Sequence, residues 1–252
     1  MALIDPLSFQ LYSIRNFPPL ESQLALVAAA GFTNVEPYGG LYGDPEGFAA
    51  LLKKAGLTAH SGHFGLDQLE NQFSAMVAAA RTLGIHTLIV PYVGGTDRGT
   101  DTASWQAFGA RLGKIAAKLK AEGLNFAWHN HDFEFEKLPD GSYPIEHILG
   151  DDIAWEADIA WVVRGHADPS LWLRHFAGRV KLVHVKDIAP AGEKTDEDGW
   201  ADVGTGTVDW ERLWGEAVAA GAEIMVAEHD NPSDAKRFAS VSAANMKKLA
   251  GL

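Results

Sequence analysis

Ionisable and other polar side chains recur at the ends of the apolar runs of this 252-residue sequence. Stretches of valine, leucine, isoleucine or aromatic residues repeatedly give way to histidine, glutamate, aspartate or lysine. An unpaired buried charge costs several kcal/mol, so such residues need a partner, a ligand or water. They are Gln10, Tyr12, Glu36, His63, Tyr92, His129, His131, Glu156, Asp158, His184, Lys186, Asp187, Glu228, His229 and Asp230.

These residue types are suited to metal binding and proton transfer. Asp158, His184 and Glu228, together with a further carboxylate, form a set of oxygen and imidazole ligands that fits Mn²⁺, Mg²⁺, Co²⁺ or Zn²⁺. The sequence contains no cysteine, which excludes thiolate ligands and disulfides. We therefore expect one divalent metal ion, and we favour manganese.

The elements that must position these residues alternate along the chain. Eight short apolar or β-branched runs are separated by segments with helical spacing, several of which end at a glycine. The predicted strands cover residues 7–14, 33–38, 58–64, 86–93, 125–131, 153–162, 180–186 and 222–230. The predicted helices include residues 21–30, 45–55, 66–83, 102–121 and 209–220, with shorter ones around 144–149 and 169–176.

Strict alternation of strands and helices requires parallel strands joined by crossovers. Eight repeats favour a closed sheet, so we predict an α/β protein with one domain over residues 1–252, a single (β/α)8 TIM barrel. An open dinucleotide-binding sheet is disfavoured because no glycine-rich turn follows Tyr12. In a barrel the strand ends converge on one mouth, where the polar residues would surround one cavity; the alternative is that each separately caps a strand or a loop.

Charge and hydropathy exclude several classes of function. The formal net charge is −12, and the short basic pairs Lys53-Lys54 and Lys247-Lys248 lie on helical patterns, so we expect no nucleic-acid partner. No run approaches the eighteen apolar residues that a membrane span needs. The start of the chain does not resemble a secretory signal, so we expect a cytoplasmic protein without membrane contact.

Six segments carry a family resemblance that covers essentially the whole chain. The sequence resembles the xylose isomerase-like superfamily of sugar isomerases and epimerases, whose members include ketose 3-epimerases, inosose dehydratases and metal-dependent apurinic endonucleases. The segments are Gly31-Phe32-Thr33-Asn34-Val35-Glu36, His129-Asn130-His131-Asp132-Phe133-Glu134, Trp155-Glu156-Ala157-Asp158, His184-Val185-Lys186-Asp187, Gly204-Thr205-Gly206-Thr207-Val208-Asp209-Trp210 and the strand that ends at Glu228.

The resemblance implies that Asp158, His184 and Glu228 are metal ligands. The epimerases have a fourth ligand, a glutamate at the end of strand five, but this sequence has histidines there. Either Glu134 folds back over the mouth to bind the metal, which we favour, or His129 replaces the carboxylate while His131 faces the substrate.

The resemblance also implies a small sugar or polyol substrate and proton abstraction next to a carbonyl, through an enediolate. Glu228 and Glu134 would be the general acid and base of an isomerase or epimerase. If the intermediate instead expels a β-oxygen, the protein is a dehydratase or lyase that acts on a keto-polyol or a 3-keto-glycoside. His131, His63 or Lys186 would then supply the acid, although an ion pair or a structural hydrogen bond explains each of them as well.

Other expectations concern the surroundings of the mouth. Glu36, His63 and His129 would contact substrate, unless Glu36 simply anchors the mouth. The aromatic faces of Trp161 and Tyr12 would wall the sugar, unless both are core residues. The acidic segment 188–202 would be a lid. A non-catalytic sugar-binding barrel and a homo-oligomer stay open, whereas the net charge disfavours an apurinic endonuclease.

Overall fold

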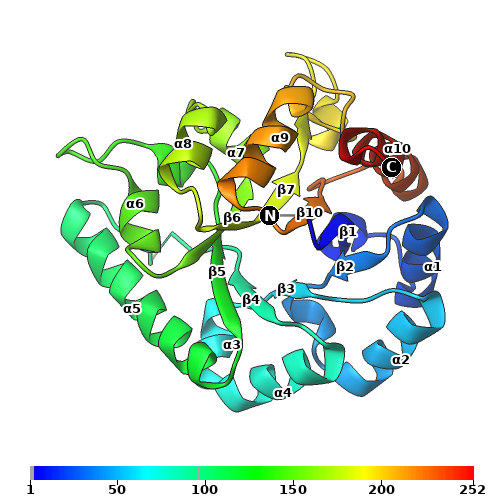
Figure 1. Cartoon of the computed structure of the whole chain (residues 1–252), viewed down its shortest axis with the longest axis horizontal. Helices are drawn as coiled ribbons and strands as arrows, with labels where there is room; N and C mark the ends of the chain where they lie inside the picture. Colours follow the sequence, from blue (N-terminus) through cyan, green and yellow to red (C-terminus); the bar gives the residue numbers. More distant parts are fainter. Residues whose placement is uncertain (1–2, 96) are drawn as a thin grey trace.

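Eight parallel strands form a closed barrel in this computed structural model, which describes residues 3–95 and 97–252 (Figure 1). The hydrogen-bonded order is β2-β1-β10-β7-β6-β5-β4-β3. β2 and β3 close the ring, because Val35 N donates to Thr58 O at 2.8 Å and His63 N to Pro37 O at 2.8 Å. The barrel strands are β1 (Asp5–Gln10), β2 (Asn34–Glu36), β3 (Ser61–His63), β4 (Thr87–Val90), β5 (Asn125–His129), β6 (Ala154–Asp158), β7 (Val180–Val185) and β10 (Ile224–Ala227).

Helices surround the strands as an outer ring (Figure 1), which confirms the predicted fold class. Within the described ranges, no helix is both long enough and apolar enough to cross a membrane. The helices are α1 (Leu20–Ala30), α2 (Pro45–Ala55), α3 (Leu66–Asn71), α4 (Phe73–Leu83), α5 (Thr102–Ala121), α6 (Pro144–Leu149), α7 (Ile159–Arg164), α8 (Pro169–His175), α9 (Trp210–Ala220) and α10 (Ala235–Ala250).

All eight predicted strands were longer than the strands of the structure, and two of them end early for a clear local reason. The strand predicted over residues 7–14 ends at Gln10, whose side-chain oxygen accepts a bond from Tyr12 N at 3.0 Å and starts a 3-10 helix, η1 (Leu11–Ile14). The strand predicted over residues 153–162 ends at Asp158, whose Oδ1 accepts from Trp161 N at 2.9 Å. Asp158 is therefore the N-cap of α7.

Strand alternation decides which side chains enter the barrel. Along β5, Phe126 and Trp128 pack outward against the helices, whereas Ala127 belongs to a small apolar cluster inside the barrel. By the same period of two, His129 follows Ala127 on the inner face. The inner apolar cluster consists of Ile89, Ala127, Leu182, Ile224 and Val226, with Ala154 packed against it.

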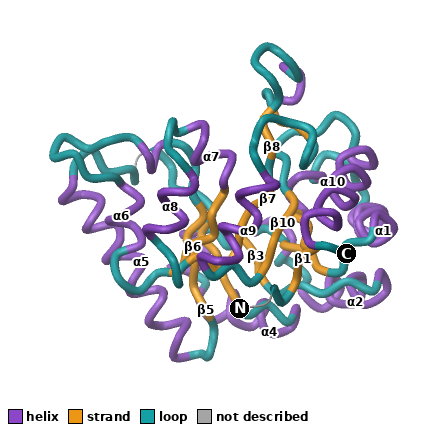
Figure 2. The backbone as a smooth tube through the Cα atoms, turned by 45° about the horizontal axis from the view of Figure 1, so that its top comes forward, coloured by secondary structure: helices purple, strands orange, loops and turns teal. Residues whose placement is uncertain are grey.

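The predicted lid is a hairpin of β8 (Asp187–Ile188) and β9 (Trp200–Ala201), with η4 (Thr195–Glu197) between them (Figure 2). Glu197 is fully buried and fixes the hairpin to the start of α10: Ser233 N donates to its Oε1 at 2.8 Å, and Arg237 Nη2 at 2.7 Å. The segment is thus bonded to the start of α10 rather than an irregular loop.

Candidate metal and substrate site

The predicted polar cluster does assemble at the carboxyl ends of the strands. Register places neighbouring members side by side: His129 on β5 lies opposite Glu156 on β6, and Asp158 lies opposite His184 on β7. Glu228 directly follows β10, the next strand of the ring. All of these side chains are at least 95% buried, so they share one enclosed environment.

Four ligand-type atoms converge at the floor of the mouth, from His129, Asp158, His184 and Glu228. His184 Nδ1 lies 3.1 Å from His129 Nε2 and 2.9 Å from Glu228 Oε2. Asp158 Oδ2 lies 3.5 Å from His129 Nε2 and 3.9 Å from His184 Nδ1. We call these four residues the ligand cluster.

The outer nitrogen of each histidine in the ligand cluster is already engaged. His129 Nδ1 lies 3.2 Å from Pro91 O, and His184 Nε2 lies 2.8 Å from Glu36 Oε1. Because a carbonyl or a carboxylate can only accept, we assign the imidazole protons to these two nitrogens. Once a cation has displaced the proton that Glu228 favours on His184 Nδ1, the facing nitrogens of both rings would present lone pairs to it, which is how ligating histidines are oriented.

The ligand cluster fits a divalent cation. Asp158 Oδ2 is buried and has no hydrogen-bond partner among the described residues, although Oδ1 caps α7. Burial disfavours the charged form of His184, but Glu156 and Glu228 outweigh it and raise its pKa well above the ordinary value, so a positive charge is favoured between these acceptors. Two imidazole nitrogens and two carboxylate oxygens suit Mn²⁺, Zn²⁺ or Co²⁺.

A second buried group lies beneath the ligand cluster and contacts it through His184. His63 Nε2 is 2.7 Å from Glu156 Oε2 and 3.1 Å from Glu36 Oε1. Burial opposes protonation of His63, but the two glutamates raise its pKa to about 9. Glu36 also accepts bonds from Gln10 and Ser61 and does not line the cavity described below. Its contacts support the anchoring role for Glu36, which positions His184.

Lys186 is a fully buried cation next to the ligand cluster. Its Nζ lies 2.6 Å from Asp230 Oδ2, 3.3 Å from Glu228 Oε2 and 3.6 Å from Asp158 Oδ2. The ammonium also lies 4.1 Å from the ring centre of Trp200. Burial favours the neutral amine, but the three carboxylates hold the pKa of Lys186 above its ordinary value. It does not line the cavity, so its position suits charge balance better than proton donation to a substrate.

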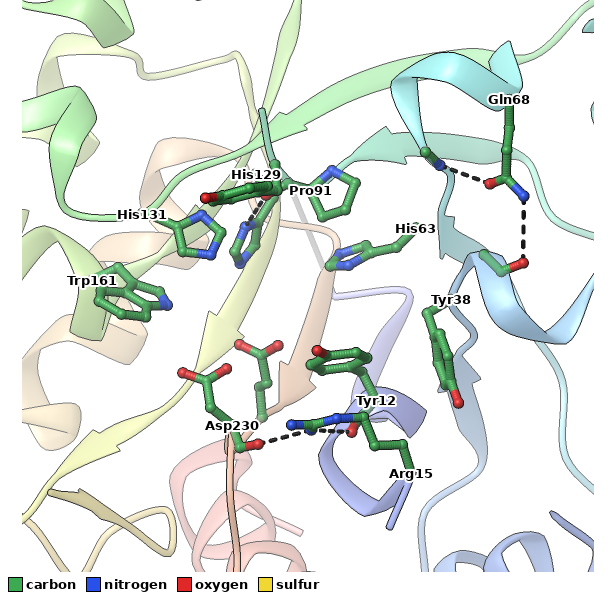
Figure 3. Close-up of a pocket in the computed structure, with 14 residues that line it drawn as sticks. Tyr12, Arg15, Tyr38, His63, Gln68, Pro91, His129, His131, Trp161 and Asp230 are labelled. Carbon is green, nitrogen blue, oxygen red and sulfur yellow. Dashed lines mark hydrogen bonds between the residues drawn. The ribbon is translucent and has the colours of Figure 1, made fainter. Parts of the chain in front are cut away.

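A cavity of about 530 Å³ opens above the ligand cluster (Figure 3). Of the predicted substrate contacts, Tyr12, His63, His129 and Trp161 line it, as does the predicted acid His131. Tyr92 and Asp230, which were among the polar residues expected around the mouth, line it as well. The sequence did not mark the other lining residues, which are Arg15, Tyr38, Gly39, Gly65, Gln68 and Pro91.

Glu134 lies apart from the ligand cluster. It belongs to a 3-10 helix, η3 (Phe133–Phe135), which turns its side chain back toward Trp128 of β5. There Trp128 Nε1 donates to Oε1 at 3.1 Å, and His131 N donates to Oε2 at 2.9 Å. The structure groups His129, and not Glu134, with Asp158, His184 and Glu228.

Glu134 makes stability depend on pH. Burial raises its pKa to about 8, although the bonds from His131 and Trp128 oppose this. The unfolded chain loses this proton near pH 4.5 and the folded chain near pH 8, so the buried Glu134 carboxyl destabilises the protein as pH rises between these values. We expect Glu134→Gln to remove that fall, about 1.4 kcal/mol for each pKa unit. Urea unfolding of both proteins at pH 5.5 and 8.5 measures it; parallel pH profiles would refute it.

His131 is a neutral imidazole in the wall of the cavity. Burial and the neighbouring His129 and Lys186 hold its pKa well below the ordinary value. Its Nδ1 is buried without a hydrogen-bond partner among the described residues, and Trp161 packs 5.1 Å away between ring centres. A neutral histidine with one unused nitrogen can accept or deliver a proton.

The glycine-rich stretch after β9 binds a carboxylate of the chain itself. Gly204 N and Gly206 N donate to Asp187 Oδ2 at 2.9 and 3.0 Å, and Val208 N donates to Oδ1 at 3.0 Å. A Cβ on Gly206 would lie 2.3 Å from Asp187 Oδ1, so only glycine fits there. These N–H groups are therefore not available to bind a phosphate group. Asp209 caps the following helix, α9, by accepting from Arg212 N at 3.3 Å.

The family model of xylose isomerase-like TIM barrels matches residues 24–249. The chain belongs to this family. Isomerase, epimerase and dehydratase structures share its barrel, which agrees with the resemblance found in the sequence. No curated protein sequence matches the chain significantly.

Solved structures with the same fold include a sugar phosphate isomerase/epimerase from Parabacteroides distasonis. It is 20% identical, with a TM-score of 0.78 over 99% of this chain and 95% of that one. A probable 3-DHS dehydratase from Bacillus anthracis is 14% identical, with a TM-score of 0.73 over 96% and 98%. The IolI protein, solved with a zinc atom, is 12% identical, with a TM-score of 0.75 over 97% of each chain. These likenesses establish the barrel.

Proposed function

We propose that the protein is a divalent-metal-dependent isomerase or epimerase of a sugar or keto-sugar. The observation that carries this proposal is the convergence of His129 Nε2, Asp158 Oδ2, His184 Nδ1 and Glu228 Oε2 at the floor of a cavity with aromatic walls. These four residues would hold the metal, and manganese is the ion we favour. When bound, such an ion orients two substrate oxygens and neutralises the negative charge that develops during proton abstraction.

Two side chains are placed to carry protons. Glu228 is 5% exposed and lines the cavity; burial opposes its ionisation, but Lys186 and His184 hold its pKa well below the ordinary value. It is therefore ionised, as a group that takes a proton from carbon must be. His131 approaches from the loop after β5: its Nδ1 would first take up a proton from water and then return it on another face of the substrate, while Glu228 releases the proton it has taken to water. Epimerisation requires such delivery from a second face.

The same contacts keep elimination as a second candidate. Glu134 does not line the cavity, so β5 supplies imidazoles rather than a second carboxylate base. An imidazole that protonates a departing β-oxygen after the same first step would make the enzyme a dehydratase or lyase. The probable dehydratase with this fold is consistent with that alternative.

Solvent exchange tests the proposed proton abstraction. The Mn²⁺-treated protein is incubated in D₂O with free ketoses, inososes and 3-keto-glycosides, and the products are followed by NMR. We expect deuterium at the carbon next to the carbonyl, and either an epimer or an enone as product. His131→Asn should keep the exchange that Glu228 catalyses but lose epimer formation. Absence of exchange into every substrate would contradict the proposal.

A further inference from the structure

The mouth of the cavity carries exposed aromatic side chains, whereas its floor carries buried polar ones. Two large aromatic side chains at the mouth, Tyr12 and Tyr92, are 40% and 49% exposed. The floor residues His63 and Glu228 are 6% and 5% exposed. All four line the same cavity. A ligand that binds at the polar floor and extends toward solvent therefore passes the rings of Tyr12 and Tyr92.

Tyr12 is held as a fixed platform. Its ring meets Tyr38 edge to face, with centres 5.3 Å apart and planes at 85°. The guanidinium of Arg15 covers one face at 3.8 Å from the ring centre, and Arg15 Nη1 donates to Tyr12 O and Asp230 O at 2.8 Å each. Figure 3 shows Arg15 on one side of the Tyr12 ring and the open cavity on the other. The face toward the cavity is free to pack on a ligand.

Tyr92 is held in a similar way on the far side of the mouth. Its ring meets His131 edge to face at 5.2 Å and Phe133 at 6.3 Å, and the guanidinium of Arg98 lies 5.1 Å from its centre. Tyr92 follows β4 and Tyr12 follows β1, with β2 and β3 between these strands in the ring. The rings of Tyr12 and Tyr92 therefore reach the mouth from strands that are not adjacent.

The charges of the cavity do not suit a phosphoryl group at this mouth. Arg15 is the one lysine or arginine among the described residues that line the cavity, and its Nη1 already donates to two backbone carbonyls. Glu228 and Asp230 add negative charge. The volume of about 530 Å³ lies in the range that encloses drug-sized ligands. Space, charge and exposed aromatic faces together favour a neutral second ring.

We propose that Tyr12 and Tyr92 form a second subsite, which binds a ring joined by a glycosidic bond to the sugar at the floor. The substrate class is then a glycoside rather than a free monosaccharide or a sugar phosphate. This inference rests on the proposed function for the floor. The ring is either an aryl group or a second sugar, since both present apolar faces to an aromatic side chain.

Calorimetric titration of the Mn²⁺-treated protein tests the subsite with three probes that share one unreactive sugar. They are methyl β-D-glucopyranoside, phenyl β-D-glucopyranoside and cellobiose, and the last two separate the aryl and sugar forms of the second ring. We expect at least one of them to bind about tenfold more tightly than the methyl glucoside. Tyr92→Ala should remove this gain and leave the affinity for the methyl glucoside unchanged.

Leu171→Ala is the matched control, because Leu171 is 58% exposed on α8 and does not line the cavity. Equal affinity for all three probes, no binding of any probe, or an equal loss for all probes in Tyr92→Ala would overturn the second subsite. Mn²⁺ titration of the same samples reports on the floor separately. A protein that binds Mn²⁺ but shows no gain from the second ring would retain the proposed function and lose the subsite.

Discussion

Asp158→Asn should leave a folded barrel that no longer retains a divalent metal ion. The asparagine oxygen can still accept the capping bond from Trp161 N, which Asp158 Oδ1 accepts at 2.9 Å. What disappears is the charge on Oδ2, which faces His129 and His184 and accepts no hydrogen bond from the described residues. Loss of an indirect contact to a metal costs about 10–100-fold in affinity, so loss of a direct ligand should cost Mn²⁺ affinity at least about 100-fold.

Activity should fall by about 1000-fold or more in the same variant, because charge stabilisation by a metal contributes several kcal/mol to such reactions. Asp209→Asn is the matched control: Asp209 is also the N-cap of a helix, α9, but lies outside the candidate site. Calorimetric Mn²⁺ titration and circular dichroism of both variants separate the two roles. Equal Mn²⁺ affinity in Asp158→Asn and the parent protein would remove Asp158 from the ligand cluster.

Lys186→Met should destabilise the metal-free protein by about 3–5 kcal/mol, because it leaves buried carboxylates without their cation. The ammonium lies within 3.6 Å of Asp158, Glu228 and Asp230, so its loss affects all three. For a chain of this length, the melting temperature should fall by on the order of 10 °C. Added Mn²⁺ should recover more stability in the variant than in the parent, because it restores positive charge among the same carboxylates.

Lys181→Met is the control on the same strand, β7, because Lys181 pairs with Glu223 at 3.0 Å but is about one-third exposed. A surface pair of this kind contributes about 0–1 kcal/mol, so this variant should melt close to the parent. Thermal and urea unfolding, each with and without Mn²⁺, make the comparison. If both substitutions had the same small effect, Lys186 would not be the internal counter-ion of the site.

Much of this arrangement follows from local rules that can be applied to the sequence. Alternating apolar and polar positions along β5 to β7 predict the inward direction of His129, Asp158 and His184, and parallel strands bring their ends to one mouth. The short predicted elements around α6 and α8 also form where expected. The ends of β1 and β6 were missed, because side chains at Gln10 and Asp158 redirect the backbone there.

Other features of the site depend on contacts between distant segments. The position of Glu134 follows from the turn of η3 and from the indole of Trp128, and neither has a signature in sequence spacing. Arg15 enters the cavity wall through a bond to Asp230 O, 215 residues away along the chain. Such contacts form only after the barrel has closed, so periodicity and composition could not predict them.

The most direct test of the proposed metal site is elemental analysis of the purified protein, before and after chelation, followed by calorimetric titration of the chelated protein with Mn²⁺. We expect about one divalent ion per chain, lost on chelation and rebound with a rise in melting temperature. A protein that retains no metal, binds no added Mn²⁺, Zn²⁺, Co²⁺ or Mg²⁺ and gains no stability from any of them would contradict the metal site, and the ligand cluster would then be a hydrogen-bonded group beneath a sugar-binding cavity.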